Sequence, residues 1–463
     1  MRNSYSDTIA AIATPLGEGG IGIVRLSGSQ AVSIAARIFR SSPRRNINEL
    51  PSHSLHYGQV VSRTKPIDEG LLAIMRAPNS YTREDVVEIQ AHGGPIPLEK
   101  ILRLVIEEGA RPAEPGEFTR RAFLNGRMDL VQAEAVADLI RARTEGAYEI
   151  ALGQLSGRFS AKVKDLRQRL IKCLTIIEAS IDFPEESGLG PGKSFQKTLR
   201  LLGDELLKLE EGAEKGRIIR EGIRAVIIGR PNVGKSSLMN ALLKEKRVIV
   251  THIPGTTRDV VEEIVNIEGI PLRIADTAGL RKTRKLIEIQ GVAQSRSYLD
   301  KADLVIIVLD GHQKLKKEDL DIIKLVKEKG KKAIAAVNKS DLPIRLEMPR
   351  LKRHFPAGMT VRISAKCLAG ISNFNRKIAP ALGIKKPGNG SENILASRLR
   401  HQISLGNARS NVHNALLAWQ NGLSAEFIAF DLWQSVEALD EILGLNYKED
   451  LLDKIFREFC IGK

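Results

Sequence analysis

The sequence predicts a multidomain protein of the α/β and α classes, in which an inserted α/β domain interrupts a helical domain. Residues 1–118 mix short β-branched runs with turn signals, which is typical of a small α+β unit. Residues 119–217 repeat apolar side chains every three or four positions, as amphipathic helices do. Residues 218–384 alternate strand-like and helix-like runs, and residues 385–463 are helical again. A chain of 463 residues has room for about three domains, so these four segments are the predicted organisation.

The first segment is predicted to contain three strands and two helices. Its apolar residues alternate in some runs, as in strands, and recur every three or four positions in others, as in helices. Gly, Pro and Asn separate these runs. A G-x-G-x-x-G pattern begins at Gly17, but a strand rather than a helix follows it, so we interpret it as a turn and expect no NAD or FAD there. The strands are expected at 21–26, 55–61 and 86–90, and the helices at 34–39 and 98–107.

The second and third segments differ in the spacing of their apolar residues. Helical spacing continues from residue 119 to about residue 181, and it resumes from 195 to 215. In the third segment, short apolar runs alternate with helical stretches, which indicates a mainly parallel sheet covered on both faces. These runs lie at 223–228, 260–267, 272–275, 304–309, 332–337 and 360–363.

Composition excludes several classes of protein. Apolar residues make up 43% and charged residues 27%, which is ordinary for a globular chain. No apolar run approaches the ~20 residues of a membrane span. The three cysteines are far apart, which excludes a disulfide framework and a C-x-x-C site, and we expect a cytoplasmic protein. A net charge of +16 favours polyanionic partners such as nucleic acid, although 4% aromatic residues argue against a base-stacking surface.

A phosphate-binding motif follows the first strand of the inserted segment. Gly229 and Gly234-Lys235-Ser236 have the spacing of a P-loop, and they stand between a strand and a helix. Glycines let backbone N–H groups surround phosphate oxygens, and the helix N-terminus adds positive potential. We expect Lys235 to reach the outer phosphates and the Ser236 hydroxyl to ligate Mg²⁺.

Three further motifs at strand ends predict that the nucleotide is GTP. Asp276 begins Asp-Thr-Ala-Gly, which can hold Mg²⁺ through water and meet a γ-phosphate. Asp341 ends Asn-Lys-Ser-Asp, and its carboxylate can accept hydrogen bonds from guanine N1 and N2, which adenine does not offer. Ser364-Ala365-Lys366 ends the next strand, where its backbone can approach the guanine carbonyl. Four such motifs in this order resemble the translation-factor-like class of GTP-binding proteins.

The loop at 251–259 is predicted to be a switch. A threonine in this loop is expected to complete the Mg²⁺ shell when the γ-phosphate is present. Arg258 in the same loop is either an arginine finger or a partner of Asp259. We favour the second interpretation, because a finger must reach the phosphate in the closed state.

The motifs together resemble one family, the MnmE/TrmE tRNA modification GTPases. The resemblance rests on GRPNVGKSSLMN, IPGTTRD, DTAGLR, NKSD and a terminal CIGK, and on the stretches ATPLGEGGIGIVRLSG, PNSYTREDVVEIQAHGG and EPGEFTRRAFLNGRMDLVQAEAVADLI. It covers nearly the whole chain. It implies an N-terminal α+β folate-binding and dimerisation domain, a discontinuous helical domain and an inserted Ras-like P-loop GTPase domain.

The resemblance also implies a reaction and its partners. A homodimer would join the flavoprotein MnmG/GidA in a heterotetrameric complex and add a carboxymethylaminomethyl group to C5 of the wobble uridine of certain tRNAs. The one-carbon unit would come from a methylene-tetrahydrofolate, whose pocket also takes 5-formyl-tetrahydrofolate. Its matching positions are Arg25, Glu88, Arg127 and Lys463. Cys460 beside them is either a reactive thiol or a packed small residue.

In this family a potassium ion takes the place of the arginine finger when two GTPase domains meet. By resemblance, K⁺ would be held by Asn232, Thr251, Ile253 and Thr256, Mg²⁺ by Ser236 and Thr257, and Glu288 would orient the attacking water. The predicted GTP-binding residues are Asn232, Val233, Gly234, Lys235, Ser236, Ser237, Thr251, His252, Ile253, Pro254, Gly255, Thr256, Thr257, Asp276, Thr277, Ala278, Gly279, Asn338, Lys339, Asp341, Ser364, Ala365 and Lys366.

A second function stays open at the level of the GTPase motifs. A GTP-controlled ribosome-assembly factor of the Era or Der type would carry the same P-loop and guanine motifs. Such a factor needs an RNA-binding module and has no use for a folate pocket or a CIGK terminus. The segments outside the GTPase domain therefore favour tRNA modification.

Overall fold

The computed structural model describes residues 7–183, 193–246, 263–274, 299–382 and 396–463. The chain divides into two compact units. The first unit combines 1–140, 154–202 and 410–463, and the second combines 141–153 and 203–409. Among the described residues, no helix is long and apolar enough to cross a membrane.

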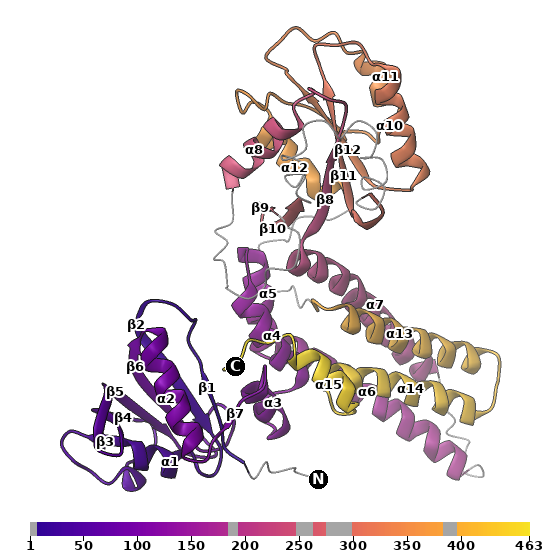
Figure 1. The fold of residues 1–463 in the computed structure, drawn as a ribbon. Helices are drawn as coiled ribbons and strands as arrows, with labels where there is room; N and C mark the ends of the chain where they lie inside the picture. The colour runs from indigo at the N-terminus through magenta and orange to yellow at the C-terminus, as the bar shows by residue number, and fades with distance from the viewer. Residues whose placement is uncertain (1–6, 184–192, 247–262, 275–298, 383–395) are drawn as a thin grey trace. The chain divides into compact units, whose positions relative to one another are not determined.

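The first unit contains a seven-stranded sheet in the order β3-β4-β5-β6-β2-β1-β7 (Figure 1). All neighbours are antiparallel except β1 and β7, which run parallel. The strands are β1 (Ile9–Ile12), β2 (Gly19–Ser27), β3 (Phe39–Ser41), β4 (Ser54–Ser62), β5 (Lys65–Met75), β6 (Val86–Gly93) and β7 (Arg111–Pro112). Helices α1 (Ala31–Ile38) and α2 (Pro95–Glu107) accompany this sheet, with a short 3₁₀ turn at Ile47–Glu49.

Alternation along β2 decides which residues of this sheet enter the core. Val24 and Leu26 are fully buried in one cluster with residues of α1 and α2. Arg25 lies between them, so its side chain points to the opposite face. Glu88 is its direct cross-strand partner on β6. The face of the sheet opposite α1 and α2 therefore presents a polar pair.

The remainder of the first unit is helical. Its helices are α3 (Glu117–Leu124), α4 (Leu130–Arg141), α6 (Arg158–Asp182), α14 (Ala425–Leu443) and α15 (Glu449–Phe456), and α7 (Lys193–Glu221) and α13 (Leu399–Gln420) each contribute one end. Segments far apart in sequence pack together here. Leu130 of α4 and Phe456 of α15 share one apolar cluster, and Arg167 of α6 forms an ion pair with Asp440 of α14. The prediction of a discontinuous helical domain is confirmed.

A buried arginine holds the N-terminal strand to α3. The Arg121 side chain is fully buried, and its Nη2 donates to Glu117 Oε1 at 3.0 Å and to Asp7 Oδ1 at 2.8 Å. Its Nη1 lies 3.3 Å from a carboxylate oxygen of Glu84. Arg111 donates to Glu117 at 2.6 Å as well. Three carboxylates thus surround Arg121, which is the compensation that a buried charge requires.

Arg121→Ala should lower the free energy of unfolding by about 3–5 kcal/mol at pH 7, because it leaves three carboxylates without their buried partner. Urea unfolding measures this, and Arg103→Ala, which removes an exposed helical ion pair, should change it by under about 0.5 kcal/mol. Burial opposes ionisation of Glu117, yet hydrogen bonds from Arg111, the Glu114 N–H and Arg121 hold its pKa below 4.5. This contribution is therefore present above pH 4.5 and lost as the pH falls through the lower folded-state pKa. An acid profile unchanged in Glu117→Gln would contradict the assignment.

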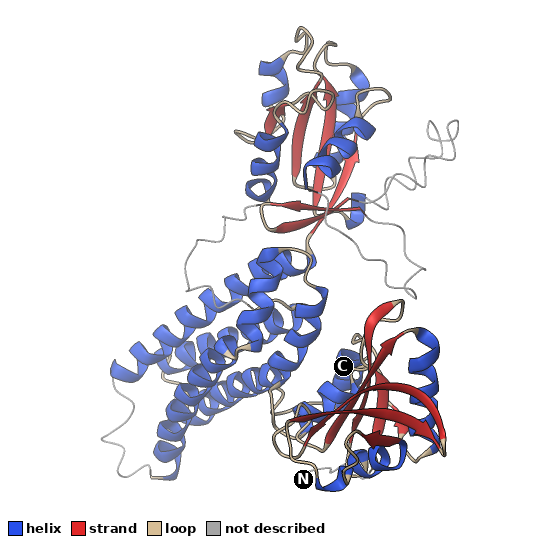
Figure 2. Ribbon diagram, turned by 90° about the vertical axis from the view of Figure 1, so that its left-hand side faces the viewer, coloured by secondary structure: helices blue, strands red, loops and turns tan. Residues whose placement is uncertain are grey.

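The second unit contains a six-stranded sheet in the order β13-β12-β11-β8-β10-β9 (Figure 2). Only β9 and β10 are antiparallel, and the other neighbours run parallel. The strands are β8 (Ile223–Ile228), β9 (Glu263–Ile267), β10 (Ile270–Ile274), β11 (Leu304–Asp310), β12 (Ala333–Asn338) and β13 (Thr360–Arg362). Helix α5 (Glu145–Leu155) lies mostly in this unit as well.

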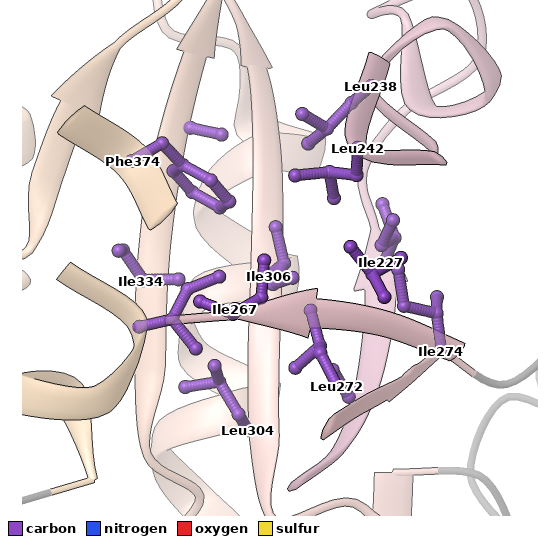
Figure 3. Packing of buried hydrophobic residues seen from close by; sticks show 14 of the residues in the cluster. Ile227, Leu238, Leu242, Ile267, Leu272, Ile274, Leu304, Ile306, Ile334 and Phe374 are labelled. Carbon is purple, nitrogen blue, oxygen red and sulfur yellow. The ribbon is translucent and has the colours of Figure 1, made fainter. Parts of the chain in front are cut away.

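Helices cover both faces of this sheet, as the alternation of runs predicts. On one face, α8 (Lys235–Lys246) and α12 (Ile371–Ala381) pack over β-strand residues in one large cluster, in which Phe374 and Leu238 are fully buried (Figure 3). On the other face, α10 (Lys317–Glu328) and α11 (Met348–Lys352) cover Val305 and its neighbours. Every residue of β11 is buried, which is typical of a central parallel strand.

The predicted fold class is confirmed, and several local predictions are wrong. Phe39 begins strand β3 instead of ending a helix, because its backbone is extended and pairs with Val60. Strands β1, β5 and β7 were not predicted; β5 alternates only weakly and carries Pro66 and Gly70. The four predicted segment boundaries stay predictions.

Candidate functional site

The P-loop joins the end of β8 to the start of α8. Its backbone is left-handed at Asn232 and Gly234, with φ of 62° and 97°. A Cβ at Gly229 would lie 2.4 Å from the Val308 carbonyl oxygen, and one at Gly234 would lie 2.1 Å from Asn338 Nδ2. Neither position therefore accepts a side chain without a shift of its neighbours, so the two motif glycines are required by packing as well as by phosphate access.

The Lys235 side chain is hydrogen-bonded to the backbone of this loop. Its Nζ donates to the carbonyl oxygens of Gly229 and Arg230, both at 2.8 Å. Burial lowers the pKa of the ammonium group. The side chain of Ser236 in the first turn of α8 is exposed, as is that of Asn232. The loop thus offers an ammonium group, free helical N–H groups and two exposed oxygen-bearing side chains at one strand end.

Asn338 connects the P-loop to the two base-reading motifs. It ends β12 and is buried, its Nδ2 donates to the Val233 carbonyl at 2.9 Å, and its Oδ1 accepts from the Ala365 N–H at 2.9 Å. The Ser364 hydroxyl donates to Asp341 Oδ1 at 2.6 Å. This hydrogen bond is the main reason that the pKa of Asp341 lies below its ordinary value. The carboxylate is therefore exposed, ionised and held at the edge where the strands end.

The neighbouring lysine has a different role from the rest of its motif. Lys339 has a left-handed backbone, with φ of 64°, and its Nζ forms an ion pair with the buried Asp310 at 2.7 Å. Asp310 ends β11, the strand next to β12. This pair fixes the turn that follows β12. Lys339 therefore acts on the site by shaping the loop that carries Asp341.

A second polar cluster lies on the face of the first sheet opposite α1 and α2. Arg25 Nε donates to Glu88 Oε1 at 2.8 Å, and its Nη1 donates to the Gly462 carbonyl at 3.3 Å. The guanidinium carbon lies 5.9 Å from the centroid of the Tyr81 ring and 5.7 Å from that of Phe118. Arg25 thus connects two strands, two aromatic rings and the C-terminal end of the chain.

The other two predicted residues belong to the same cluster. The Arg127 guanidinium lies 4.7 Å from the Tyr81 ring centroid, which is within cation–π range. Burial and the nearby charge of Arg25 lower the pKa of Lys463, while Glu88 acts in the opposite direction. The tail that carries Lys463 is pressed against β1, since a Cβ at Gly462 would lie 2.4 Å from the Ile12 carbonyl oxygen.

Tyr81 is the residue of this cluster that sequence reasoning missed. Both arginines lie near its ring, with guanidinium carbons 5.9 Å and 4.7 Å from the centroid, and its hydroxyl is 2.9 Å from Thr119 Oγ1. Burial raises the pKa of that hydroxyl. Its position within Pro-Asn-Ser-Tyr, a stretch that carries the resemblance, was the available signal. Cys460 is exposed, so its interpretation as a packed small residue is wrong.

Comparisons with known proteins place these sites in a family. Residues 8–127 match the model of the GTP-binding protein TrmE N-terminus, and residues 130–460 match the MnmE helical domain. A relative from Geobacillus kaustophilus described as tRNA modification GTPase MnmE is 45% identical over 468 residues and covers 99% of both chains. The chain belongs to the MnmE family. A protein of the same description from Clostridioides difficile is also 45% identical, over 461 residues and 99% of both chains.

Two solved structures match about a third of this chain. The G domain of the T. maritima FeoB iron transporter is 27% identical, and the match covers 34% of this chain and 98% of that one with a TM-score of 0.26. The FeoB G domain from Methanococcus jannaschii is 24% identical, with 35% and 98% covered and a TM-score of 0.26. Membership of the MnmE family, whose members are described as GTPases, rests on the full-length relatives.

The structure describes only part of the predicted site. The P-loop residues from Asn232 to Ser237 and the motif residues from Asn338 to Lys366 are described, and they meet at one edge of the sheet. The predicted switch, potassium and water-orienting residues lie outside the described part. These are Thr251, His252, Ile253, Pro254, Gly255, Thr256, Thr257, Arg258, Asp276, Thr277, Ala278, Gly279 and Glu288.

Proposed function

We propose that this chain hydrolyses GTP in the presence of potassium to drive, with a flavoprotein partner, the addition of a carboxymethylaminomethyl group to C5 of the wobble uridine of certain tRNAs. Membership of the MnmE family supports the reaction class. The proposed assembly is a homodimer, formed through residues 1–118, that binds the flavoprotein MnmG/GidA in the cytoplasm. The four segments 1–118, 119–217, 218–384 and 385–463 are the domains of this proposal.

The observation that carries the GTPase part is the double hydrogen bond of Asn338. One amide side chain contacts the phosphate loop through Val233 and the base-side loop through Ala365. These two hydrogen bonds hold the phosphate-side loop and the base-side loop together. Asp341 then reads guanine N1 and N2, while Lys235 faces the outer phosphates. The proposed contact would select guanine over adenine, because adenine does not offer these two donors.

The residues present fit the two proposed metal ions. Mg²⁺ takes oxygen ligands, and Ser236 offers an exposed hydroxyl at the start of α8. Asn232 offers an exposed amide oxygen on a left-handed backbone. We propose that Ser236 and Thr257 hold Mg²⁺, and that Asn232, Thr251, Ile253 and Thr256 hold K⁺. The ions would supply positive charge where negative charge develops during phosphoryl transfer.

The chain itself contributes positioning. Lys235 neutralises charge on the outer phosphates, and the N–H groups of the P-loop hold the phosphate oxygens. Glu288 is proposed to orient the attacking water through its carboxylate. With the water held in line with the departing phosphate, the barrier falls mainly through orientation rather than through covalent chemistry.

We further propose that the cluster around Arg25 binds a tetrahydrofolate derivative, either 5-formyl- or methylene-tetrahydrofolate. Arg25 and Lys463 lie near the Glu88 carboxylate, and Arg127 contacts the Tyr81 ring that Arg25 also approaches. A ligand with a hydrogen-bonding pterin edge and glutamyl carboxylates satisfies both kinds of group. The aromatic ring of Tyr81 offers a stacking surface for the pterin.

Arg25→Ala and deletion of Lys463 should each weaken binding of 5-formyl-tetrahydrofolate by about tenfold or more, because each removes a charge-assisted contact. GTP hydrolysis should stay within about twofold, since these residues belong to the first unit. Isothermal titration calorimetry gives the affinity, and Arg44→Ala, an exposed arginine of the same domain, is the matched control. Equal affinities in Arg25→Ala and Arg44→Ala would reject the pocket.

The proposed reaction is tested by mass spectrometry of wobble uridines from cells that lack this chain. Modification should be lost and should return with the wild-type chain. The Asp341→Asn chain should not restore it, because it lacks the guanine contact. Unchanged modification in the deleted cells would reject the proposed function and would leave the GTPase geometry unaffected.

A further inference from the structure

The second unit contains a cavity at the edge of the sheet opposite the P-loop. Its volume is about 490 Å³. Its lining comes from the C-terminal half of α7, from residues that begin β8 or directly precede β8, β11 and β12, from Arg273 of β10, and from Leu382 after α12. The P-loop and Asn338 lie at the other ends of β8 and β12. The cavity is therefore separate from the nucleotide site, and nothing in the proposed reaction uses it.

Positive charge predominates in the lining. Five basic and three acidic side chains line the cavity. Arg224 is neutralised by Asp303, to which it donates from both Nε and Nη2 at 3.2 and 3.1 Å. Lys331 and Lys332 instead donate to backbone carbonyl oxygens, at 2.7 Å and 2.8 Å, so their charges meet no carboxylate in these contacts.

Two arginines of the lining have buried nitrogen atoms without a partner. Nε of Arg273 and Nε of Arg217 are both buried, and within the described residues neither has a hydrogen-bond acceptor. Arg217 is otherwise joined to Glu221 by an ion pair at 3.4 Å. Buried donors in native proteins almost always have a hydrogen-bond acceptor. Two guanidinium nitrogens without an acceptor beside a cavity therefore indicate that an acceptor is missing.

The sheet also brings two like charges together beside this cavity. Arg273 on β10 and Arg224 on β8 are direct partners in the parallel register. Like charges directly opposite on neighbouring strands repel each other. Asp303 compensates Arg224, and no described carboxylate forms an ion pair with Arg273. An anion in the cavity would satisfy the Arg273 guanidinium and offset this repulsion.

We propose that this cavity is a binding site for a phosphate group, with Arg273 and Arg217 as its principal donors and Lys331 and Lys332 as supporting cations. Phosphate suits the arginines because the guanidinium fork matches two of its oxygens. The volume admits a small phosphorylated compound, and the open side would equally admit one phosphate of a tRNA backbone. A bound phosphate would connect α7 to strand β10 and to the segment that precedes β12, because its donors come from all three.

The test uses the full-length chain saturated with GDP, so that the P-loop is filled. Inorganic pyrophosphate is the small-molecule probe, titrated by calorimetry, and tRNA is the second probe, followed by fluorescence anisotropy. The variants are Arg273→Gln and Arg273→Lys. Arg353→Gln is the matched control, because Arg353 is an exposed arginine of the same unit outside the cavity.

Arg273→Gln should weaken pyrophosphate binding by tenfold or more, whereas Arg353→Gln should stay within twofold. Arg273→Lys keeps the charge but loses the planar fork, so it should fall between the two. Loss of tRNA affinity confined to Arg273→Gln, without saturable pyrophosphate binding, would identify a backbone phosphate as the ligand. GDP affinity equal to wild type in all variants reports an intact domain. If both probes bind Arg273→Gln and Arg353→Gln alike, the site is rejected, whatever the outcome for the proposed tRNA reaction.

Discussion

Asp341→Asn should weaken GTP binding by about 100-fold or more. The carboxylate is expected to accept two hydrogen bonds from guanine N1 and N2, and each bond to a charged group contributes about 1.5–3 kcal/mol. Asparagine keeps the shape but replaces one acceptor oxygen with an NH₂ donor, which faces a donor of guanine. Xanthosine triphosphate has a carbonyl there, so its affinity should rise. Displacement of a fluorescent nucleotide measures both affinities.

The control for this substitution is Asp321→Asn, which neutralises an exposed aspartate on α10 of the same domain. It should change neither affinity by more than about twofold, because exposed charges far from a ligand contribute little. The Ser364 hydrogen bond holds the pKa of Asp341 down, so wild-type GTP affinity should not fall between pH 7 and pH 5 through this group. An unchanged ratio of GTP to xanthosine triphosphate affinity in Asp341→Asn would show that another residue reads the base.

The nucleotide site shows what sequence can predict and what it cannot. The motif residues that we propose contact nucleotide are constrained locally, since each follows a strand of a recognisable apolar pattern. Their order therefore predicted that Gly234, Asn338 and Ala365 lie at one edge of a sheet. The side-chain hydrogen bonds of Asn338 to Val233 and Ala365 span 105 and 27 residues. Such contacts depend on tertiary packing, which no local pattern encodes.

The prediction of the cluster around Arg25 rested on the family resemblance and not on residue spacing. Arg25 and Glu88 lie 63 residues apart, and the contact of Arg25 with Gly462 spans 437 residues. Taken alone, each side chain is an ordinary charged residue of an antiparallel sheet. Only the cross-strand register and the docking of the C-terminal tail bring them together. Tyr81 was missed because an aromatic residue in a turn-rich stretch has no distinguishing periodicity.

The wrong secondary-structure predictions in the first sheet have a different physical origin. Strand β5 was not predicted, because Pro66 and Gly70 interrupt its sequence and most of its residues are only half-buried. Its long pairing with β4 and β6 supplies the backbone hydrogen bonds that stabilise it. Phe39 is apolar at helical spacing from α1, yet pairing with β4 takes it into a strand. Tertiary pairing overrides local preference in both cases.

Hydrolysis of GTP should be faster in KCl than in NaCl at equal ionic strength, by about 100-fold or more. Negative charge gathers between the β- and γ-phosphates during phosphoryl transfer, and removing one preorganised stabilising group costs about 100-fold or more in such sites. Lys235 and Mg²⁺ supply part of the positive charge. Sodium is too small to satisfy the same set of oxygens without contracting it. Steady-state phosphate release in the two salts measures the ratio.

Asn232 is the proposed potassium ligand that lies within the described residues, so it provides the decisive variant. Asn232→Gly removes the amide oxygen while tolerating the left-handed backbone at φ 62°. It should reduce the ratio of the KCl to the NaCl rate towards one. The control is Asn240→Ala, on the exposed side of α8. Alanine is used here because glycine would destabilise the helix interior. Asn240→Ala should keep the full ratio.

Two further variants separate the ion from the other candidates for catalysis. Glu288→Ala should slow hydrolysis about 100-fold or more in KCl and spare GTP binding, because the carboxylate positions water rather than metal. Potassium should still promote association of the GTPase domains with a transition-state mimic in that variant. Arg258→Ala should keep most of the activity, since potassium supplies the charge that an arginine finger would bring. Equal rates in the two salts would remove the potassium role, and a large loss in Arg258→Ala without a loss of binding would restore the finger. Unchanged turnover in Glu288→Ala would leave the attacking water to be oriented by another group.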